Sequence, residues 1–239
     1  VCAQSVLELN DGSLSAERRE KKERIAQDLR KIAYDMDFSA LFDNSKSLFH
    51  IGFDYNNGVL NQSWYDLLAS EARLSYFVAC AMNKIPVKAW FSLGRLLIKA
   101  DKVRALISWG GTMFEYLMPV IFTPNVEDTL LDESCKNVVI AQRKYAESLS
   151  KKRTIPWGIS ESGYYAFDQS MYYQYRAFGV PKLGLCPIRE RELVIAPYAT
   201  VLALLVDKEA ACDGIRLFDE SMRGRYGYFE AIDYTNSRV

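Results

Sequence analysis

One carboxylate, Glu161, lies in the stretch Trp-Gly-Ile-Ser-Glu-Ser-Gly-Tyr-Tyr (157–165), between two serines and outside any helical pattern. Serine hydroxyls can donate hydrogen bonds that keep a carboxylate ionised, as a nucleophile requires. The aromatic neighbours Trp157, Tyr164 and Tyr165 could stack on the apolar faces of sugar rings. Taken alone, the stretch fits a turn with a solvated glutamate at least as well.

A second carboxylate, Glu71, follows Leu67 by four residues and precedes Leu74 by three. In a helix this spacing places Glu71 on the apolar face. Burial disfavours the charged form of a carboxyl, and such a group suits a general acid. A structural ion pair with Arg73 or Arg104 explains the same pattern equally well.

Three further acids are less distinctive. Thr112 and Glu115 have the spacing of a capping box, in which the glutamate binds back to the N-cap amide. Glu230 and Asp233 are three residues apart, hence on one side of any helical turn, and fit either ligand contacts or a cap. These patterns leave both roles open.

Several classes of site are excluded by composition. The chain has one histidine, His50, which rules out serine–histidine triads and two-histidine metal sites, and it has no Gly-rich phosphate loop. We expect His50 to be structural and no cofactor or metal to be needed. Lys plus Arg and Asp plus Glu both number 30, so nothing indicates a nucleic-acid partner. Five widely spaced cysteines predict reduced thiols rather than a disulfide framework.

Hydrophobic periodicity predicts a chain of helices with little strand, stacked helix on helix. The 63–83 helix would begin with a Ser63–Asp66 capping box. We expect a β-hairpin or meander at 40–60, with turns at 43–45 and 56–58, and an irregular aromatic loop over 157–185. Helices are predicted at 15–36, 63–83, 112–122, 126–150, 197–206 and 207–222.

Five stretches, in this order, resemble the glycoamylase-like domain of cyclic β-1,2-glucan synthases. They are YDLLASEARLSYFVA, SWGGTMFEYLMP, PWGISESGYYAFDQSMYYQYRAFGVPKLGL, VIAPYATVLAL and GRYGYFEAIDYTNSR. The resemblance runs from about Ala40 to the end of the chain. It implies one mainly α domain over 1–239, an (α/α)-toroid of the six-hairpin glycosidase type. The family has a segment close to Met-Ala-His-His-Gln-Gly-Met after Asp-Tyr-Thr, which is missing here, so we expect an incomplete toroid.

The resemblance also implies an activity on linear β-1,2-glucan, namely retaining transglycosylation that closes the glucan into a ring. It makes Glu161 the nucleophile and Glu71 the acid/base. Alternatives are an endo-β-1,2-glucanase-type hydrolase and a non-catalytic carbohydrate-binding segment. The parent is expected in the inner membrane, with this soluble segment on the cytoplasmic side and not touching the bilayer. The implied substrate-binding residues are Trp109, Glu115, Trp157, Tyr165, Tyr175, Arg176, Glu230 and Asp233.

Overall fold

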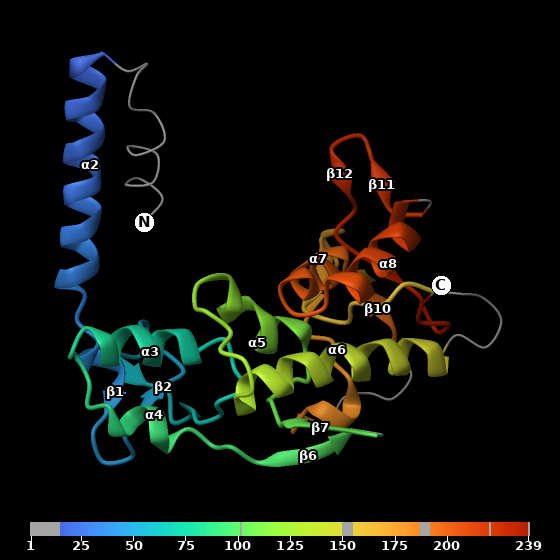
Figure 1. Cartoon of the computed structure of the whole chain (residues 1–239), viewed down its shortest axis with the longest axis horizontal. Helices are drawn as coiled ribbons and strands as arrows, with labels where there is room; N and C mark the ends of the chain where they lie inside the picture. The colour runs from blue at the N-terminus through green and yellow to red at the C-terminus, as the bar shows by residue number, and fades with distance from the viewer. Residues whose placement is uncertain (1–14, 101, 150–154, 187–191, 220, 239) are drawn as a thin grey trace.

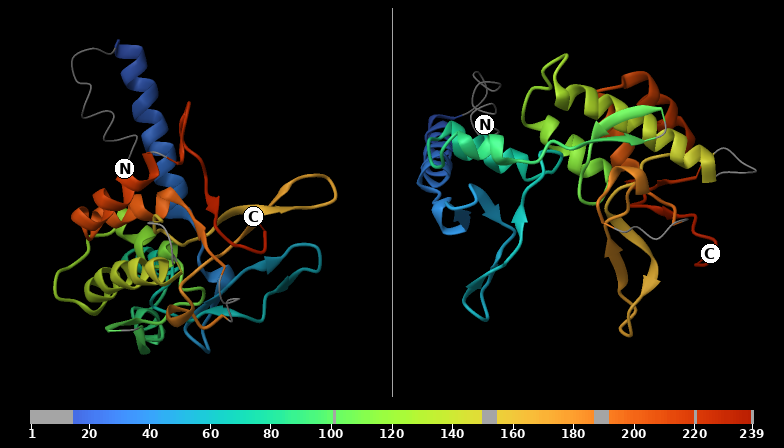
Figure 2. Two further views of the ribbon diagram at one scale, coloured as in Figure 1. Left: turned by 90° about the vertical axis from the view of Figure 1, so that its right-hand side faces the viewer. Right: turned by 90° about the horizontal axis from the view of Figure 1, so that it is seen from below.

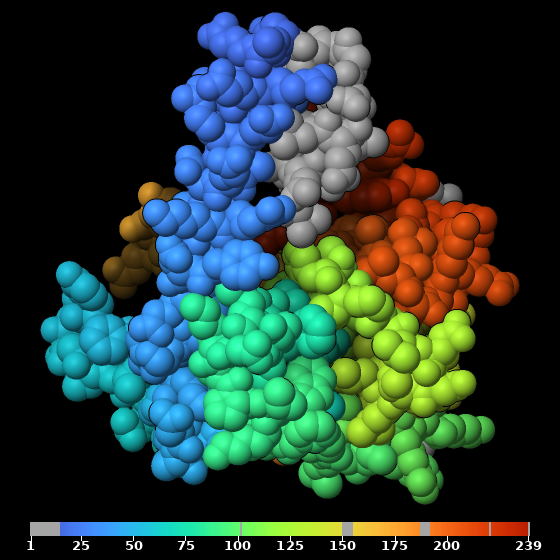
Figure 3. Space-filling view, turned by 60° about the vertical axis from the view of Figure 1, so that its left-hand side comes forward, coloured from blue at the N-terminus to red at the C-terminus, as the bar shows by residue number. Residues whose placement is uncertain are grey.

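The first element of the fold is a solvent-exposed helix that projects from the body of the molecule (Figures 1 and 3). The computed structural model describes residues 15–100, 102–149, 155–186, 192–219 and 221–238. Helix α2 (Ala16–Asp35) confirms the helix predicted at 15–36. Ser15 is its N-cap, because the Ser15 hydroxyl accepts from the Arg18 amide. None of its residues is buried, so the apolar side chains of Ile25, Leu29 and Ile32 face solvent, as does Met36 directly after the helix.

A three-stranded sheet follows, which confirms the predicted β-meander. Strands β1 (Phe42–Asp43) and β5 (Trp64–Tyr65) flank β2 (Leu48–His50), and β3 (Phe53–Asp54) pairs with β4 (Val59–Leu60). His50 is structural, as expected: its ring is buried and its Nδ1 lies 2.6 Å from the Asn61 carbonyl oxygen.

The predicted helix over 63–83 is wrong in its first half. Helix α3 covers only Arg73–Ala81, and residues 64–65 are strand β5. The Tyr65 carbonyl accepts from the Tyr76 hydroxyl, and the Asp66 carbonyl accepts from the Gly94 amide at 2.6 Å. These long-range bonds override local helix propensity, so the Ser63–Asp66 capping box does not form.

The middle of the chain supplies a helical layer and a hairpin that the sequence did not reveal. Strands β6 (Leu97–Ala100) and β7 (Val103–Leu106) pair antiparallel, and β7 packs against α6 (Leu130–Leu149). Short helices α4 (Lys88–Ser92) and α5 (Met113–Leu117) complete this part. Pro119 lies in the 3₁₀ turn η2 (Met118–Ile121), so α5 ends before the predicted helix over 112–122 does.

The predicted aromatic loop at 157–185 is instead a β-hairpin. Strands β8 (Ser162–Phe167) and β9 (Tyr173–Arg176) pair antiparallel with a register shift between Tyr164 and Phe167. Aromatic side chains favour strands, and the bulge explains why the alternation is irregular. Figure 2 shows this hairpin (gold) and β3–β4 (cyan) projecting on the same side of the molecule, away from the helices.

The last part of the chain packs helices on the middle layer. The predicted pair is present as α7 (Pro197–Leu202), with Pro197 in its first turn, and α8 (Lys208–Asp219); α7 contacts both α5 and α8. Among the residues described, the fold is helix-rich but carries more strand than expected. The remaining elements are η1 (Ser39–Leu41), η3 (Pro181–Leu183), η4 (Ala203–Leu205), β10 (Val194–Ile195) paired with β13 (Ile232–Asp233), and β11 (Arg223–Gly224) paired with β12 (Gly227–Tyr228).

Candidate active site

Glu161 lies directly before β8, half-buried, with its backbone held from two sides. The Tyr198 hydroxyl donates to the Glu161 carbonyl oxygen at 2.9 Å and lies 2.8 Å from the Ser160 hydroxyl. The Ser160 hydroxyl also accepts from the Phe114 amide at 3.0 Å. The peptide that carries Glu161 is therefore fixed between α5 and α7.

The expectation that the flanking serines donate to the Glu161 carboxylate is wrong. The Ser160 hydroxyl is used by Phe114 and Tyr198, and the buried Ser162 Oγ has no partner among the described residues. The raised pKa of Glu161 agrees with the absence of hydrogen bonds from these serines to its carboxylate. Burial raises the pKa of Glu161, and the charges of Glu71 and Glu115 raise it further.

Three distant segments of the chain meet here, because Arg73 donates to both the Ser70 and Glu115 carbonyls and the Phe114 amide donates to the Ser160 hydroxyl. Glu71, Glu115 and Glu161 are separated by 44 and 46 positions, and the first two are the charges that act on the third. These two charges favour the protonated form of Glu161. A pair of carboxyls facing one substrate is the usual equipment for nucleophilic and acid/base catalysis on glycosidic bonds.

Glu71 does not lie on a helical face. It occupies a turn before α3 and is half-exposed, and its carboxylate accepts from the Ser70 hydroxyl at 3.2 Å. No ion pair joins it to Arg73 or Arg104 in the described part of the chain, so the alternative of a structural pair is wrong. Its carboxylate remains accessible to a ligand.

Glu115 is buried, and its carboxylate is occupied by hydrogen bonds from residues of the preceding loop. The predicted capping box with Thr112 is confirmed, and the carboxylate also accepts from the Gly110 amide at 2.8 Å and the Ser108 hydroxyl at 2.9 Å. Burial raises the pKa of Glu115 against the opposing effect of these hydrogen bonds. Glu115 thus shapes the loop that carries Trp109, whose side chain is 63% exposed.

Two tyrosines near the carboxylates, Tyr65 and Tyr198, were not among the predicted site residues. Burial raises the pKa of Tyr65, and the charges of Glu71 and Glu161 raise it further. Burial raises the pKa of Tyr198 above its usual value. Both residues lie inside stretches that carry the family resemblance, but aromatic type alone did not distinguish them from core residues.

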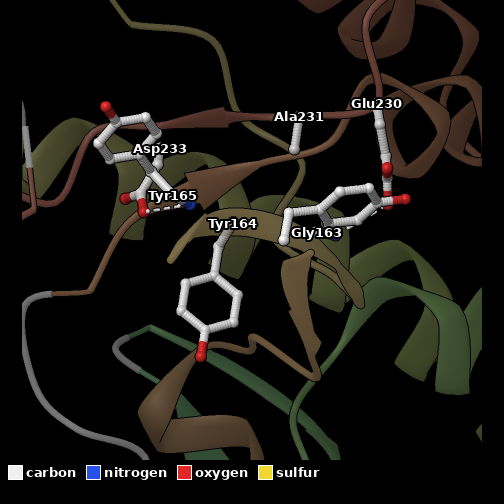
Figure 4. Close-up of a pocket in the computed structure, with 7 residues that line it drawn as sticks. Gly163, Tyr164, Tyr165, Glu230, Ala231 and Asp233 are labelled. Atoms are coloured by element: carbon white, nitrogen blue, oxygen red, sulfur yellow. Dashed lines mark hydrogen bonds between the residues drawn. The ribbon is translucent and has the colours of Figure 1, made fainter. Parts of the chain in front are cut away.

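The aromatic residues of the β8–β9 hairpin border the site. Tyr175 is 61% exposed, and the charges of Glu161 and Glu230 add to burial in raising its pKa. Beside it lies an open pocket of about 230 Å³ (Figure 4). The pocket is lined by Gly163, Tyr164, Tyr165, Tyr173, Glu230, Ala231 and Asp233.

The acids of this pocket are not on a helical turn, which corrects the spacing argument. Glu230 precedes β13 and accepts from the Gly163 amide at 2.8 Å. Asp233 is in β13, accepts from the Tyr165 amide at 3.2 Å, and forms an ion pair with Arg238. Figure 4 shows both carboxylates directed at the backbone of β8.

Two predicted binding residues, Trp157 and Arg176, are held by contacts with other parts of the chain. Trp157 is 5% exposed, and its indole packs where α8 passes at Gly214, so it offers no free face for stacking. Arg176 forms an ion pair with Glu192, and its guanidinium lies over the rings of Tyr164 and Phe178. Trp157 therefore stabilises the wall of the site rather than lining it, while a sugar contact by Arg176, whose side chain is 36% exposed, stays a prediction.

Other kinds of site are not evident in the described residues. They contain no group of three histidine, cysteine, aspartate or glutamate side chains able to hold a metal. Their cysteines, Cys80, Cys135, Cys186 and Cys212, are free. None of the described helices has the length and apolar character needed to cross a membrane.

The chain is similar to known proteins in both sequence and fold. Over 211 residues, 88% of this chain, the sequence is 41% identical to the cyclic beta-(1,2)-glucan synthase NdvB of Rhizobium meliloti (strain 1021), of whose length it covers 7%. The fold is similar to the endo-beta-1,2-glucanase of Chitinophaga pinensis, solved with sophorotriose and glucose (TM-score 0.65, 17% identity, 90% of this chain and 54% of that one). It is also similar to a "putative glucoamylase" of Bacteroides caccae ATCC 43185 (TM-score 0.68, 14% identity, 98% and 58%).

These relatives indicate a carbohydrate-active domain. The Glycoamylase family model, described as "Putative glucoamylase", matches residues 63–239, which include all three glutamates of the site. The chain therefore belongs to the glycoamylase family.

Proposed function

We propose that this domain acts on linear β-1,2-glucan by retaining transglycosylation and closes the glucan into a ring. The observation that carries the proposal is that hydrogen bonds from Arg73 and Phe114 join the segments of Glu71, Glu115 and Glu161, beside exposed aromatic side chains. The identity to a cyclic glucan synthase supports the substrate and the product.

In the first step the Glu161 carboxylate attacks the anomeric carbon of a glucose unit. The bond from this carbon to O2 of the next unit breaks, and Glu71 gives its proton to the departing oxygen, directly or through a substrate hydroxyl. The product is a glycosyl ester on Glu161. Glu115 lies too deep to act on the sugar and contributes its charge and the shape of the Trp109 loop.

In the second step the 2-hydroxyl at the other end of the same glucan attacks the ester-linked anomeric carbon. Glu71 takes the proton of this hydroxyl, the Glu161 carboxylate is released, and the second inversion restores the β configuration. Tyr165, Tyr175 and Trp109 are the exposed aromatic side chains suited to stacking on the glucose units. Exclusion of water favours ring closure over hydrolysis.

The architecture and setting of this activity are part of the proposal. We infer one glycoamylase-like domain over residues 1–239 whose helices form part of an (α/α)-toroid, for which the similarity to glucanase structures gives support. The domain acts within a longer synthase of the inner membrane, on its cytoplasmic side, without touching the bilayer or nucleic acid itself.

The test is incubation of linear β-1,2-glucan with the wild-type chain, Glu161→Gln and Glu71→Gln, followed by mass spectrometry. Ring closure gives products one water lighter than the linear glucan of equal length. We expect no turnover by Glu161→Gln and a loss of about 10²–10⁴-fold for Glu71→Gln. Equal turnover by Glu161→Gln and wild type would show that the domain is a non-catalytic binding segment.

Azide separates the two catalytic roles. If Glu161 is the nucleophile, azide added to Glu161→Gly gives an α-glycosyl azide, because a single inversion occurs. Azide added to Glu71→Ala gives the β-glycosyl azide, because the ester still forms. The reverse pattern would exchange the two roles.

Hydrolysis of the same substrate is the second candidate, favoured by the similarity in fold to an endo-beta-1,2-glucanase. The chemistry differs only in that water resolves the ester. Linear oligosaccharides without rings, with incorporation of ¹⁸O from labelled water, would establish it.

A further inference from the structure

The structure contains a buried cation that the proposed mechanism does not use. Arg73, the first residue of α3, is 5% exposed, although no carboxylate among the described residues lies within ion-pair distance of it. Burial lowers the pKa of this guanidinium. A buried charge without an ion pair destabilises the fold unless hydrogen bonds compensate it.

The guanidinium joins two segments that are distant in the sequence. Its Nη1 donates to the Ser70 carbonyl at 3.1 Å and to the Glu115 carbonyl at 2.8 Å, and its Nη2 donates to the Tyr116 carbonyl. Glu115 and Tyr116 belong to the last turn of α5, where carbonyls lack helical partners and carry partial negative charge. Arg73 thus caps α5 from the start of α3.

The first of these contacts fixes the turn that carries Glu71. The Ser70 carbonyl accepts from Arg73, and the Ser70 hydroxyl accepts from the Ala72 amide and donates to the Glu71 carboxylate. The other two contacts fix α5, whose Phe114 amide holds Ser160 beside Glu161. One side chain therefore connects the supports of both catalytic carboxylates.

We propose that Arg73 is a positioning residue that sets the distance between the Glu71 and Glu161 carboxylates. This inference rests on the proposed function. Arg73 contacts no sugar, so its loss leaves substrate binding intact and slows the chemical steps. Displacement of a catalytic group by about 1 Å can cost on the order of 10²-fold in rate.

Arg95 provides a matched control. Its guanidinium also donates to three backbone carbonyls, those of Trp90, Phe91 and Leu93, but all belong to its own region around α4. Arg95→Met removes a comparable set of hydrogen bonds without a direct contact to Ser70 or α5, although the neighbouring Gly94 pairs with Asp66 and Leu68. Arg73→Lys keeps the charge but not the planar fork, so it rescues only in part.

The experiment measures kcat and KM on linear β-1,2-glucan for wild type, Arg73→Met, Arg73→Lys and Arg95→Met at a temperature where all are folded. We expect kcat to fall about 10²-fold in Arg73→Met, less in Arg73→Lys and not in Arg95→Met, with KM within about twofold throughout. Equal kcat in Arg73→Met and Arg95→Met would overturn the inference, as would a rise in KM alone.

Hydrogen exchange tests the connection without any activity. In Arg73→Met, segments 70–72 and 113–117 should lose protection together, and in Arg95→Met neither should, because the Leu68 amide, which pairs with the Arg95 region, lies outside both segments. Unchanged exchange in both segments would overturn the inference. A wild-type chain without turnover, or one whose turnover survives Glu161→Gln, would contradict the proposed function alone, and exchange would then decide the role of Arg73.

Discussion

The Tyr198 hydroxyl donates a hydrogen bond of 2.9 Å to the Glu161 carbonyl oxygen, from helix α7 to the segment before β8. The same hydroxyl reaches Ser160, so it fixes two consecutive residues of the candidate site. We predict that Tyr198→Phe costs about 1 kcal/mol of stability and lowers kcat roughly tenfold. Steady-state kinetics and urea unfolding would check this, with the 91% exposed Tyr226→Phe as a neutral control.

Glu161→Gln should stabilise the fold at neutral pH while it abolishes turnover. The pKa of Glu161 is raised above its ordinary 4.5, so the ionised side chain opposes folding as pH rises through that raised pKa. Below the ordinary pKa both folded and unfolded chains are protonated and the penalty disappears. With solvent screening of this half-exposed group, we expect under about 1 kcal/mol, or up to about 4 °C in Tm.

The measurement is Tm of both chains at pH 7 and at pH 3, chosen on either side of the ordinary glutamate pKa of about 4.3. If Glu161→Gln is less stable than wild type at pH 7, or if its Tm exceeds that of wild type equally at both pH values, the raised pKa of Glu161 would be contradicted.

Asp233→Asn should reduce the acid sensitivity of the fold. Burial alone would raise the pKa of Asp233, but hydrogen bonds from Arg238 and Thr235 outweigh it and lower the pKa below 3.8. The stability that Asp233 contributes is therefore complete above its ordinary pKa and is lost as pH falls through the lowered one. We predict that the variant is less stable at pH 6 and that the difference narrows below about pH 3, the range set by an aspartate of ordinary pKa about 3.9.

Thermal unfolding across pH 2–7 would measure that difference, the interval within which aspartates and glutamates titrate. Asp213→Asn is the control, because its ion pair with Arg216 is exposed and worth at most about 1 kcal/mol. A constant difference between Asp233→Asn and wild type at all pH values would refute the ion-pair explanation.

Gly179→Ala should prevent stable folding. A Cβ at this position would lie 1.9 Å from the Gly110 carbonyl oxygen and 2.6 Å from the Gly111 carbonyl carbon, both backbone atoms of the loop that Glu115 holds. We expect a loss above about 3 kcal/mol, since neither chain segment can move without breaking this loop. Gly52→Ala, with nothing within 4 Å of the added methyl, should change stability by less than about 0.5 kcal/mol in urea unfolding.

The sequence by itself determined the parts whose cause is local. The repeating apolar positions of 130–149 define one helix, Thr112 and Glu115 form their capping box, and Pro197 and Pro119 take the helix-end positions that their rings allow. The order of motifs also identified the glycoamylase-like domain, because long stretches carry far more information than single residues. Each of these features depends on neighbours a few positions apart.

Tertiary structure decided what depends on distant partners. Residues 64–72 follow a helical pattern, but pairing of Trp64–Tyr65 with β2 and the bond from Gly94 to Asp66 hold 64–67 extended, and Glu71 lies in the turn that follows. The flanking serines of Glu161 suggested donors to its carboxylate, yet Phe114 and Tyr198 use Ser160 instead. Trp157 and Arg176 resembled sugar contacts but are held by Gly214 and Glu192. Spacing along a chain does not reveal such contacts, since packing fixes which of several possible partners a polar or aromatic side chain obtains.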